Sequence, residues 1–252
     1  MRVTVLGCSG SLVGRGEPAS GYLVEHGGGR FVVDMGTGVL GALQEHADPS
    51  DVDVVLTHLH GDHCLDLQGL IIWRRFHPVT PAAGRALLYG PEDTAGRIGR
   101  ISADSPDGMD DISDTFDVRR VRDGEAFTLH GVEMLPASMV HPVEAYGYRM
   151  SAGGFTVAYT GDTAWHDGLV PFAAGADVLF CEATWCGTPE GRPEGMHMSG
   201  AEAGRLAREA GVGVLALVHI PPYGDPDGCL AAARAEFGGE IVLAHSGMAV
   251  GD

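Results

Sequence analysis

A short run of histidine and aspartate residues constrains this chain more than any other feature of its sequence. Four side chains that bind metals lie within six positions, namely His58, His60, Asp62 and His63. The run follows an apolar segment, 52–56, that is typical of a buried strand, and it precedes a segment with helical apolar spacing, 64–76. Imidazole and carboxylate groups gathered in such a loop are the ligands that zinc and similar ions prefer. The sequence therefore predicts a metal site at the end of a strand.

The spacing within the run favours convergence of its side chains. His58 and His60 are two positions apart, so an extended backbone turns both imidazoles to the same side. Gly61 permits a sharp turn, after which Asp62 and His63 stand at the start of the helix. We expect all four side chains to face one space.

Three isolated polar residues also follow apolar segments that are typical of strands: His141, Asp162 and His219. Functional side chains in layered α/β folds collect at the carboxyl ends of strands. Each of the three could by itself be a surface histidine or a turn aspartate. Together with the run of four, they are enough to complete two metal sites.

Short apolar segments alternate with turn residues along the chain, without internal repeats. The pattern predicts strands over 2–6, 22–25, 30–33, 52–56, 86–89, 118–121, 126–129, 132–135, 146–150, 156–160, 178–181, 214–218 and 241–244. It predicts helices over 39–46, 64–76, 165–174, 199–210 and 226–237. Several strands follow one another directly, which favours sheets covered by helices over a strictly alternating parallel sheet. No proline-rich linker divides residues 1–252, so we expect one domain.

The charge balance excludes some functions and disfavours others. The chain has 34 acidic and 16 basic residues and a formal net charge of −18. Every basic residue is an arginine, which excludes a lysine Schiff base or a P-loop lysine. An acidic surface repels polyanions, so tRNA is disfavoured as a partner. The aspartate-rich segment 102–117 is expected to be a solvated loop or flap.

The chain is expected to be soluble and cytoplasmic. No apolar run reaches the ~18 residues that a membrane span needs, and the N-terminus resembles a first strand more than a signal peptide. The five cysteines are odd in number and irregular in spacing, which predicts reduced thiols rather than a disulfide framework.

These motifs together resemble those of the metallo-β-lactamase superfamily, and within it the RNase Z-like branch, over nearly the whole chain. The resemblance implies an α/β (α+β) fold, a four-layer αββα sandwich, with two divalent ions that would be zinc or alternatively manganese. The β-lactamases commonly have a cysteine where Asp162 stands, and flavodiiron proteins have a glutamate where His60 stands. Both departures disfavour those branches.

The resemblance also implies a role for each residue. The first metal would take His58, His60 and His141, the second would take Asp62, His63 and His219, and Asp162 would bridge them. A hydroxide held between the two metals would be the nucleophile, and Asp62 is counted among the catalytic residues as well as the ligands. Glu182 and His197 are similar to a pair in RNase Z-like phosphodiesterases, in which the histidine protonates the leaving oxygen and the glutamate orients it.

Further matches resemble the mycobacterial-type cyclic-nucleotide phosphodiesterases of actinobacteria, at 5–11, 18–22, 38–44, 73–78 and 219–222. They imply hydrolysis of 3′,5′-cyclic AMP or GMP to the 5′-monophosphate, and a homodimer is expected by analogy. The interval between His141 and Asp162 has no room for the arm with which RNase Z-type nucleases grip tRNA. The alternatives are an RNase Z-like nuclease, a lactone or thioester hydrolase on the same site, and a non-enzymatic metal-binding protein.

Substrate contacts are less constrained by the sequence. Ser9 and Ser11 could contact phosphate from a glycine-rich loop, although turn chemistry explains them equally well. Tyr223 is favoured over Trp73 and Trp185 as an aromatic contact, and core packing is the expected role of Trp73. Arg74 and Arg75 are expected only to end a helix. His245 is expected to support the ligands at most, and Ser246 stands where related chains often have an aspartate.

Overall fold

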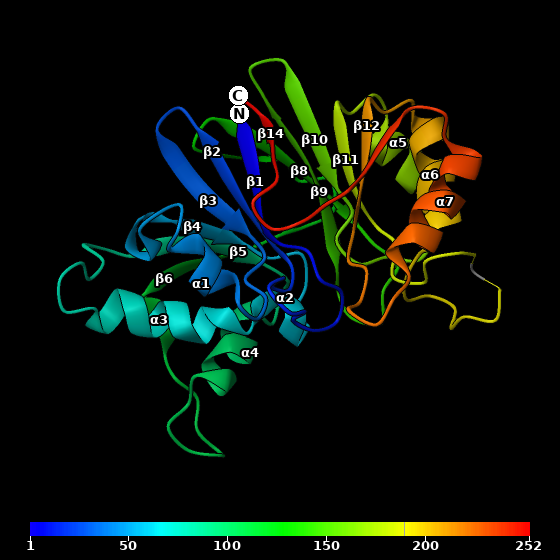
Figure 1. Ribbon diagram of the computed structural model, residues 1–252. Coiled ribbons are helices and arrows are strands. Elements are labelled where there is room, and N and C mark those ends of the chain that lie inside the picture. The colour runs from blue at the N-terminus through cyan, green and yellow to red at the C-terminus, as the bar shows by residue number, and fades with distance from the viewer. Residues whose placement is uncertain (189) are drawn as a thin grey trace.

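The computed structural model describes residues 1–188 and 190–252, and these form two seven-stranded mixed sheets that lie face to face (Figure 1). The strand order is β14-β1-β2-β3-β4-β5-β6 in the first sheet and β13-β12-β11-β10-β9-β8-β7 in the second. The strands of the first sheet are β1 (Arg2–Gly7), β2 (Gly21–His26), β3 (Gly29–Val33), β4 (Asp53–Val55), β5 (Ala86–Gly90), β6 (Phe116–Arg120) and β14 (Ala249–Gly251). Those of the second are β7 (Phe127–Leu129), β8 (Val132–Ser138), β9 (Tyr146–Ala152), β10 (Phe155–Tyr159), β11 (Val178–Glu182), β12 (Val214–Val218) and β13 (Glu240–Leu243).

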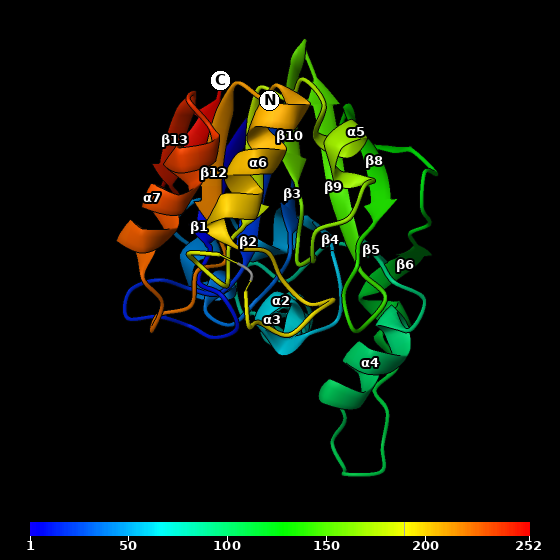
Figure 2. The ribbon, with the colours of Figure 1, turned by 90° about the vertical axis from the view of Figure 1, so that its right-hand side faces the viewer.

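Helices cover the outer face of each sheet, as two perpendicular views show (Figures 1 and 2). The first sheet is covered by α1 (Val39–Leu43), α3 (Asp66–Phe76) and α4 (Thr94–Ile101), whose apolar side chains form one core with it. The second is covered by α5 (Leu169–Ala173), α6 (Gly200–Ala210) and α7 (Pro226–Glu236). The remaining helical segments are α2 (Gly61–Cys64), η1 (Pro49–Asp51) and η2 (Ile112–Asp114). The expected αββα sandwich is confirmed.

Strands such as β2 and β12 are apolar on both faces because each face packs against another layer, whereas β8 alternates between buried and exposed side chains. In β2, Tyr22 and Val24 belong to the core between the sheets, whereas Leu23 packs against the helices outside. In β12, Val218 faces the core between the sheets and Leu217 faces the outer helices. Successive side chains of a strand point to opposite faces, so continuous apolar runs are what a four-layer sandwich needs.

Parallel pairing brings the strand ends that carry the site to one edge. β3 and β4 are parallel in the first sheet, and β10, β11 and β12 are parallel in the second. The carboxyl ends of parallel neighbours lie at the same edge of a sheet, so the loops after these five strands can meet.

Several predicted elements differ from the observed ones. The helix predicted over 64–76 is α3, which begins two residues later, and a separate short helix, α2, precedes it. The helix predicted over 165–174 is only the short α5. The terminal strand β14 and the helix α4 were not predicted, because β14 is short and α4 contains two glycines. β14 is an edge strand of the first sheet and pairs antiparallel with β1.

The aspartate-rich segment 102–117 is a solvated loop only in its first part. The stretch after α4 projects from the body of the molecule (Figure 2), but η2 and the start of β6 lie within the segment and bury Ile112 and Phe116. Arg75 pairs with Asp110 at 2.7 Å and with Asp114 at 2.6 Å. The expectation that Arg75 only ends a helix was therefore incomplete, because its guanidinium fastens this segment to α3.

None of the helices in the described part of the chain has the length and apolar character to cross a membrane. All five cysteines are free thiols and all are buried. The thiols therefore contribute to the cores rather than to cross-links, as their spacing predicted.

The N-terminus of α7 offers a test of local stability. Asp225 is its N-cap and accepts a hydrogen bond from the backbone N–H of Gly228 at 3.0 Å. We expect Asp225→Ala to lower the free energy of unfolding by about 1 kcal/mol, because it leaves that N–H without its acceptor. Asp225→Asn keeps the acceptor and is the control in chemical denaturation. Equal stability of the alanine variant and the parent would contradict the assignment.

Candidate metal centre

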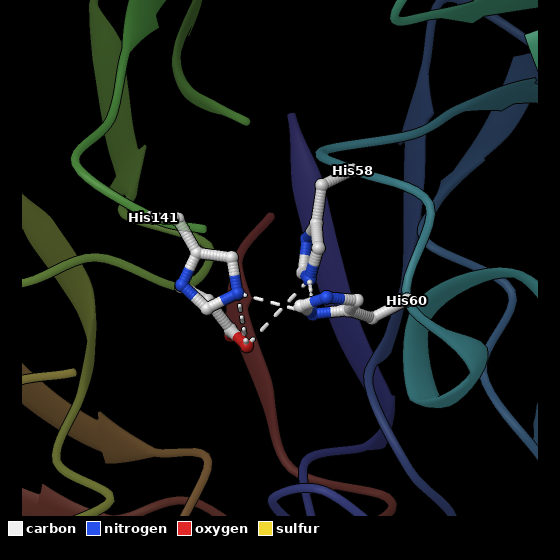
Figure 3. Close-up of side chains that lie close together, drawn as sticks. His58, His60 and His141 are labelled. Atoms are coloured by element: carbon white, nitrogen blue, oxygen red, sulfur yellow. Dashed lines mark hydrogen bonds and ion pairs between the residues drawn. The ribbon is translucent and has the colours of Figure 1, made fainter. Parts of the chain in front are cut away.

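The candidate metal ligands meet where loops from both sheets approach each other. The run from His58 to His63 follows β4 and continues into α2, while His141, Asp162 and His219 follow β8, β10 and β12. Figure 3 shows the imidazoles of His58, His60 and His141 pointing toward one another. Residues far apart in the sequence therefore form one polar centre.

His58, His60 and His141 form what we call the three-histidine cluster. The Nδ1 atom of His60 lies 3.1 Å from His58 Nε2 and 3.1 Å from His141 Nε2. Nitrogen atoms bound ~2.0–2.1 Å from one tetrahedral ion stand ~3.3–3.4 Å apart, so this spacing fits a zinc-sized ion.

Asp62, His63 and His219 form a second group, the mixed cluster. His219 Nε2 lies 3.1 Å from Asp62 Oδ2 and 3.4 Å from His63 Nε2. His63 and His219 are buried, whereas the Asp62 side chain is 12% exposed. The mixed cluster is thus open to solvent through its carboxylate.

Asp162 stands between the two clusters and presents one oxygen to each. Its Oδ2 faces His58 Nε2 at 3.7 Å, while its Oδ1 faces His63 Nε2 at 3.2 Å and His219 Nε2 at 3.3 Å. Oδ1 is buried and has no hydrogen-bond partner among the described residues. A buried carboxylate oxygen without a donor is costly unless a cation satisfies it. The donor set and this orphaned oxygen fit a pair of divalent ions bridged by Asp162.

The pKa values of two ligands reflect their burial and the charges of their neighbours. Burial by itself raises the pKa of Asp162, but the neighbouring His219 and His63 hold it well below its ordinary value. Burial lowers the pKa of His58, and the adjacent His63 lowers it further. A His58 side chain held neutral in this way is ready to bind a metal.

The opposite ring nitrogens of the ligands are held by residues that the sequence analysis did not identify. Asp34 Oδ2 lies 2.8 Å from His63 Nδ1, and Thr57 Oγ1 lies 3.0 Å from His58 Nδ1. Asp34 also accepts hydrogen bonds from Thr57 and from the hydroxyl of Tyr159. Such partners orient each imidazole and raise its basicity toward a metal.

The two histidine ligands that follow strands of the second sheet, His141 and His219, are also held at their Nδ1 atoms. Thr184 Oγ1 lies 2.8 Å from His219 Nδ1 and donates to Glu182 Oε2 at 2.9 Å. His141 Nδ1 lies 2.8 Å from the carbonyl oxygen of Met196, which places the proton on Nδ1. The Nε2 atoms of both histidines are thereby left to face the clusters.

The backbone around the mixed cluster is strained and closely packed. Asp34 and His219 have φ values of 63° and 59°, in the left-handed region that non-glycine residues rarely adopt. A side chain at Gly36 would collide with the carbonyl oxygen of Asp62, and one at Gly10 would collide with that of His219. Strain concentrated at one place in a fold is typical of functional sites.

Glu182 and His197 form a pair beside the clusters. Glu182 Oε1 lies 2.9 Å from His197 Nδ1 and accepts a hydrogen bond from the backbone N–H of Thr163 at 2.8 Å. His197 Nδ1 is 4.0 Å from Asp162 Oδ2, and the His197 ring lies near those of His141 and His219. The structure therefore brings the predicted acid and its orienting residue to the edge of the centre.

The structure distinguishes among the residues suggested for substrate contact. The backbone N–H of Ser11 lies 3.4 Å from His219 Nε2, beside the mixed cluster. Ser9 is buried, pairs with Ile220 and lines a cavity of about 380 Å³ that contains none of the cluster residues. Tyr223 is 77% exposed, and it contributes to neither cluster.

Other residues named from the sequence lie outside the clusters. His245 is exposed, and its Nδ1 pairs with the carbonyl oxygen of Ser246. Trp73 is half-buried and stacks on His77, so the core role expected for it was only partly correct. The buried Arg74 donates to the carbonyl oxygens of Ser50 and Gly84, which is more than the helix-ending role expected for it.

A family model described as the beta-lactamase superfamily domain matches residues 29–220, a span that contains all seven proposed ligands. The chain belongs to the metallo-β-lactamase superfamily. An uncharacterised protein of Mycobacterium leprae is 50% identical to it over 249 residues, covering 98% of this chain and 87% of the relative. By its family, the present chain is a metal-dependent hydrolase, and its two clusters are typical of a dinuclear metal site in this superfamily.

Two further relatives cover nearly the whole chain. The metallo-β-lactamase fold protein YhfI of Bacillus subtilis is 32% identical, with 98% of both chains covered, and its crystal structure superposes with a TM-score of 0.87 over 99% of this chain and 98% of that one. Ribonuclease Z of Halobacterium salinarum is 30% identical, with 98% of this chain and 96% of the relative covered. Its alignment runs over 298 positions, more than the 252 residues present here, so that relative has segments that this chain lacks.

The position of Asp162 predicts the effect of its removal on metal binding. We expect the parent to bind about two zinc ions per chain. Asp162→Ala should bind fewer, because both clusters lose a ligand. Zinc should raise the thermal midpoint of the parent and raise that of the variant much less. Elemental analysis after dialysis and thermal unfolding check both effects. Asp104→Ala, in the exposed acidic loop, is the matched control, and full zinc content in Asp162→Ala would refute the bridge.

Asp34 permits a separate test of support for the ligands. We expect Asp34→Asn to weaken zinc affinity by about 10–100-fold, because the amide no longer provides a charged acceptor for His63 Nδ1. Competition with a chromogenic chelator measures the affinity. Thermal unfolding of the metal-free proteins is the control for folding. Unchanged zinc affinity would show that Asp34 only packs the loop.

Proposed function

We propose that the chain is a phosphodiesterase that uses two divalent ions, preferably zinc, to hydrolyse 3′,5′-cyclic nucleotides to 5′-monophosphates. The observation that carries this proposal is the Glu182–His197 pair, joined at 2.9 Å at the edge of the two clusters. A leaving alkoxide needs a proton, and this pair provides one at the position where such an oxygen departs.

The chemistry of His197 follows from its surroundings. Its Nδ1 faces Glu182, which leaves Nε2 to donate to the leaving oxygen. Burial alone lowers the pKa of His197, but the hydrogen bond and charge of Glu182 outweigh burial and raise it. In the reaction, water attacks phosphorus, the bond from phosphorus to O3′ breaks, and O3′ takes the proton from His197. The attacking water loses a proton to solvent, and His197 recovers its proton from solvent, so the cycle balances.

The clusters supply the remaining functions of such a site. Divalent ions bound there would acidify water and offset the charge that develops on the phosphoryl oxygens. Asp62, the solvent-accessible carboxylate of the mixed cluster, can accept a hydrogen bond from the attacking water and hold it in line. Thr184 contacts both His219 and Glu182, so it couples the orientation of a ligand to that of the acid.

A small diester suits the chain better than a large RNA. Between His141 and Asp162 there are only β9 and β10, joined by a tight turn at Gly153 and Gly154. The Ribonuclease Z relative, an enzyme named for cleaving RNA, has segments that are missing here. The net charge of −18 further opposes binding of a polyanion.

The test is turnover of 3′,5′-cyclic AMP by the zinc-loaded protein, with bis(p-nitrophenyl) phosphate as a second substrate. We expect His197→Ala to lower kcat for cyclic AMP by about 10²–10⁴-fold. Its effect on the nitrophenyl diester should be much smaller, because nitrophenolate leaves without a proton. His245→Ala, at an exposed histidine outside the clusters, is the matched control.

Other outcomes identify the rival functions. Cleavage of the nitrophenyl diester but not of cyclic AMP would keep the chemistry and remove the proposed substrate. Salt-sensitive cleavage of precursor tRNA would favour a nuclease. Turnover of lactones or thioesters that survives His197→Ala, with both diesters inert, would overturn the phosphodiesterase proposal.

A further inference from the structure

We propose that a cavity beside His197, lined by Trp165, Trp185 and Arg192, is the subsite that binds an aromatic base on the leaving side of the substrate. The inference rests on the proposed function, because His197 marks the leaving side only if it protonates the leaving oxygen. The cavity has a volume of about 210 Å³. His197 is part of its lining, whereas the residues of the two metal clusters are not.

Two loops, those after β10 and β11, provide these three residues. Trp165 lies before α5, Trp185 lies in the loop after β11, and Arg192 lies in the same loop a few residues before His197. The ring centroid of Trp185 is 5.2 Å from that of His197, at an interplanar angle of 83°. The imidazole therefore separates the metal clusters from a space with aromatic walls.

Trp185 has an unsatisfied donor at this position. Its Nε1 atom is buried and has no hydrogen-bond partner among the described residues. A buried N–H without an acceptor costs free energy, so a ligand atom that accepts from it would be favoured. A heterocyclic base offers such acceptors along its edge, and it has a flat face that can stack on a second ring such as that of Trp165, which also lines the cavity.

Arg192 provides the second element of recognition. Its guanidinium carbon lies 5.7 Å from the centre of the Trp185 ring. Within residues 1–188 and 190–252, Arg192 forms no ion pair, although acidic residues outnumber arginines 34 to 16 in the chain. An arginine that faces an aromatic ring can stack on a base and donate hydrogen bonds to it.

The covalent structure of a cyclic nucleotide directs its base to this place. The leaving O3′ must stand at His197 Nε2, and the ribose that carries O3′ also carries the base. Since the phosphate occupies the metal side of His197, the base extends toward the other side. Stacking on a tryptophan is typically worth about 5–150-fold in affinity per base. The subsite would therefore select nucleotides among small diesters.

The experiment compares cyclic AMP with 1-deoxyribose 3′,5′-cyclic phosphate, which has the same diester but no base. We expect Trp185→Leu and Arg192→Gln to lower kcat/KM for cyclic AMP by about tenfold, mainly through KM. Turnover of the baseless diester should stay at the parent level. Trp185→Phe should restore only part of the loss, because it keeps an aromatic face but lacks the indole N–H.

Matched controls are Trp73→Leu on α3 and Arg208→Gln on α6, which lie outside the cavity. Equal losses on both diesters in Trp185→Leu and Arg192→Gln would overturn the inference while leaving the phosphodiesterase proposal intact. A parent enzyme without preference for cyclic AMP over the baseless diester would do the same.

If no diester is turned over, the proposed function fails and the subsite is tested by binding. Isothermal titration with adenosine 5′-monophosphate is then carried out on the parent and both variants. Binding that Trp185→Leu and Arg192→Gln each weaken by about tenfold supports a base subsite without the proposed reaction. Absent binding, or equal binding in all the proteins, overturns it.

Discussion

The site depends on one carboxylate, Asp162, which is 2% exposed and lies between two groups of imidazoles. Removing a carboxylate from water is costly, and the cost is offset only by cations or by hydrogen-bond donors. Here one oxygen has no donor among the described residues and faces His63 and His219. Much of the surrounding structure serves to hold these imidazoles in the orientation that a bound cation requires.

The αββα architecture explains how such a polar centre coexists with apolar cores. The cores lie between the sheets and beneath the outer helices, whereas the clusters lie in loops at the edge where parallel strands end. Ligands come from both halves of the sandwich, so the ions would fasten one half to the other. Thermal stability and metal occupancy should therefore be linked in this chain.

Much of the fold, and the ligand residues as a group, could be predicted from local patterns. The run from His58 to His63 is concentrated in one loop, and His141, Asp162 and His219 each follow an apolar strand segment. Asp34 follows β3 in the same way and could have been found by that criterion, but a single aspartate in a turn is common. Thr57 and Thr184 gave no signal, because their roles depend on contacts made only after the sheets have assembled.

The chain order of the ligands has a consequence for biosynthesis. The three-histidine cluster and Asp162 are all translated well before His219, which follows β12 near the C-terminal end of the second sheet. However, the two sheets include β12 and β14, which come late in the chain, so the loops that carry the ligands can meet only when nearly all of it has been made. Both clusters would therefore become ready for ions together, near the end of synthesis.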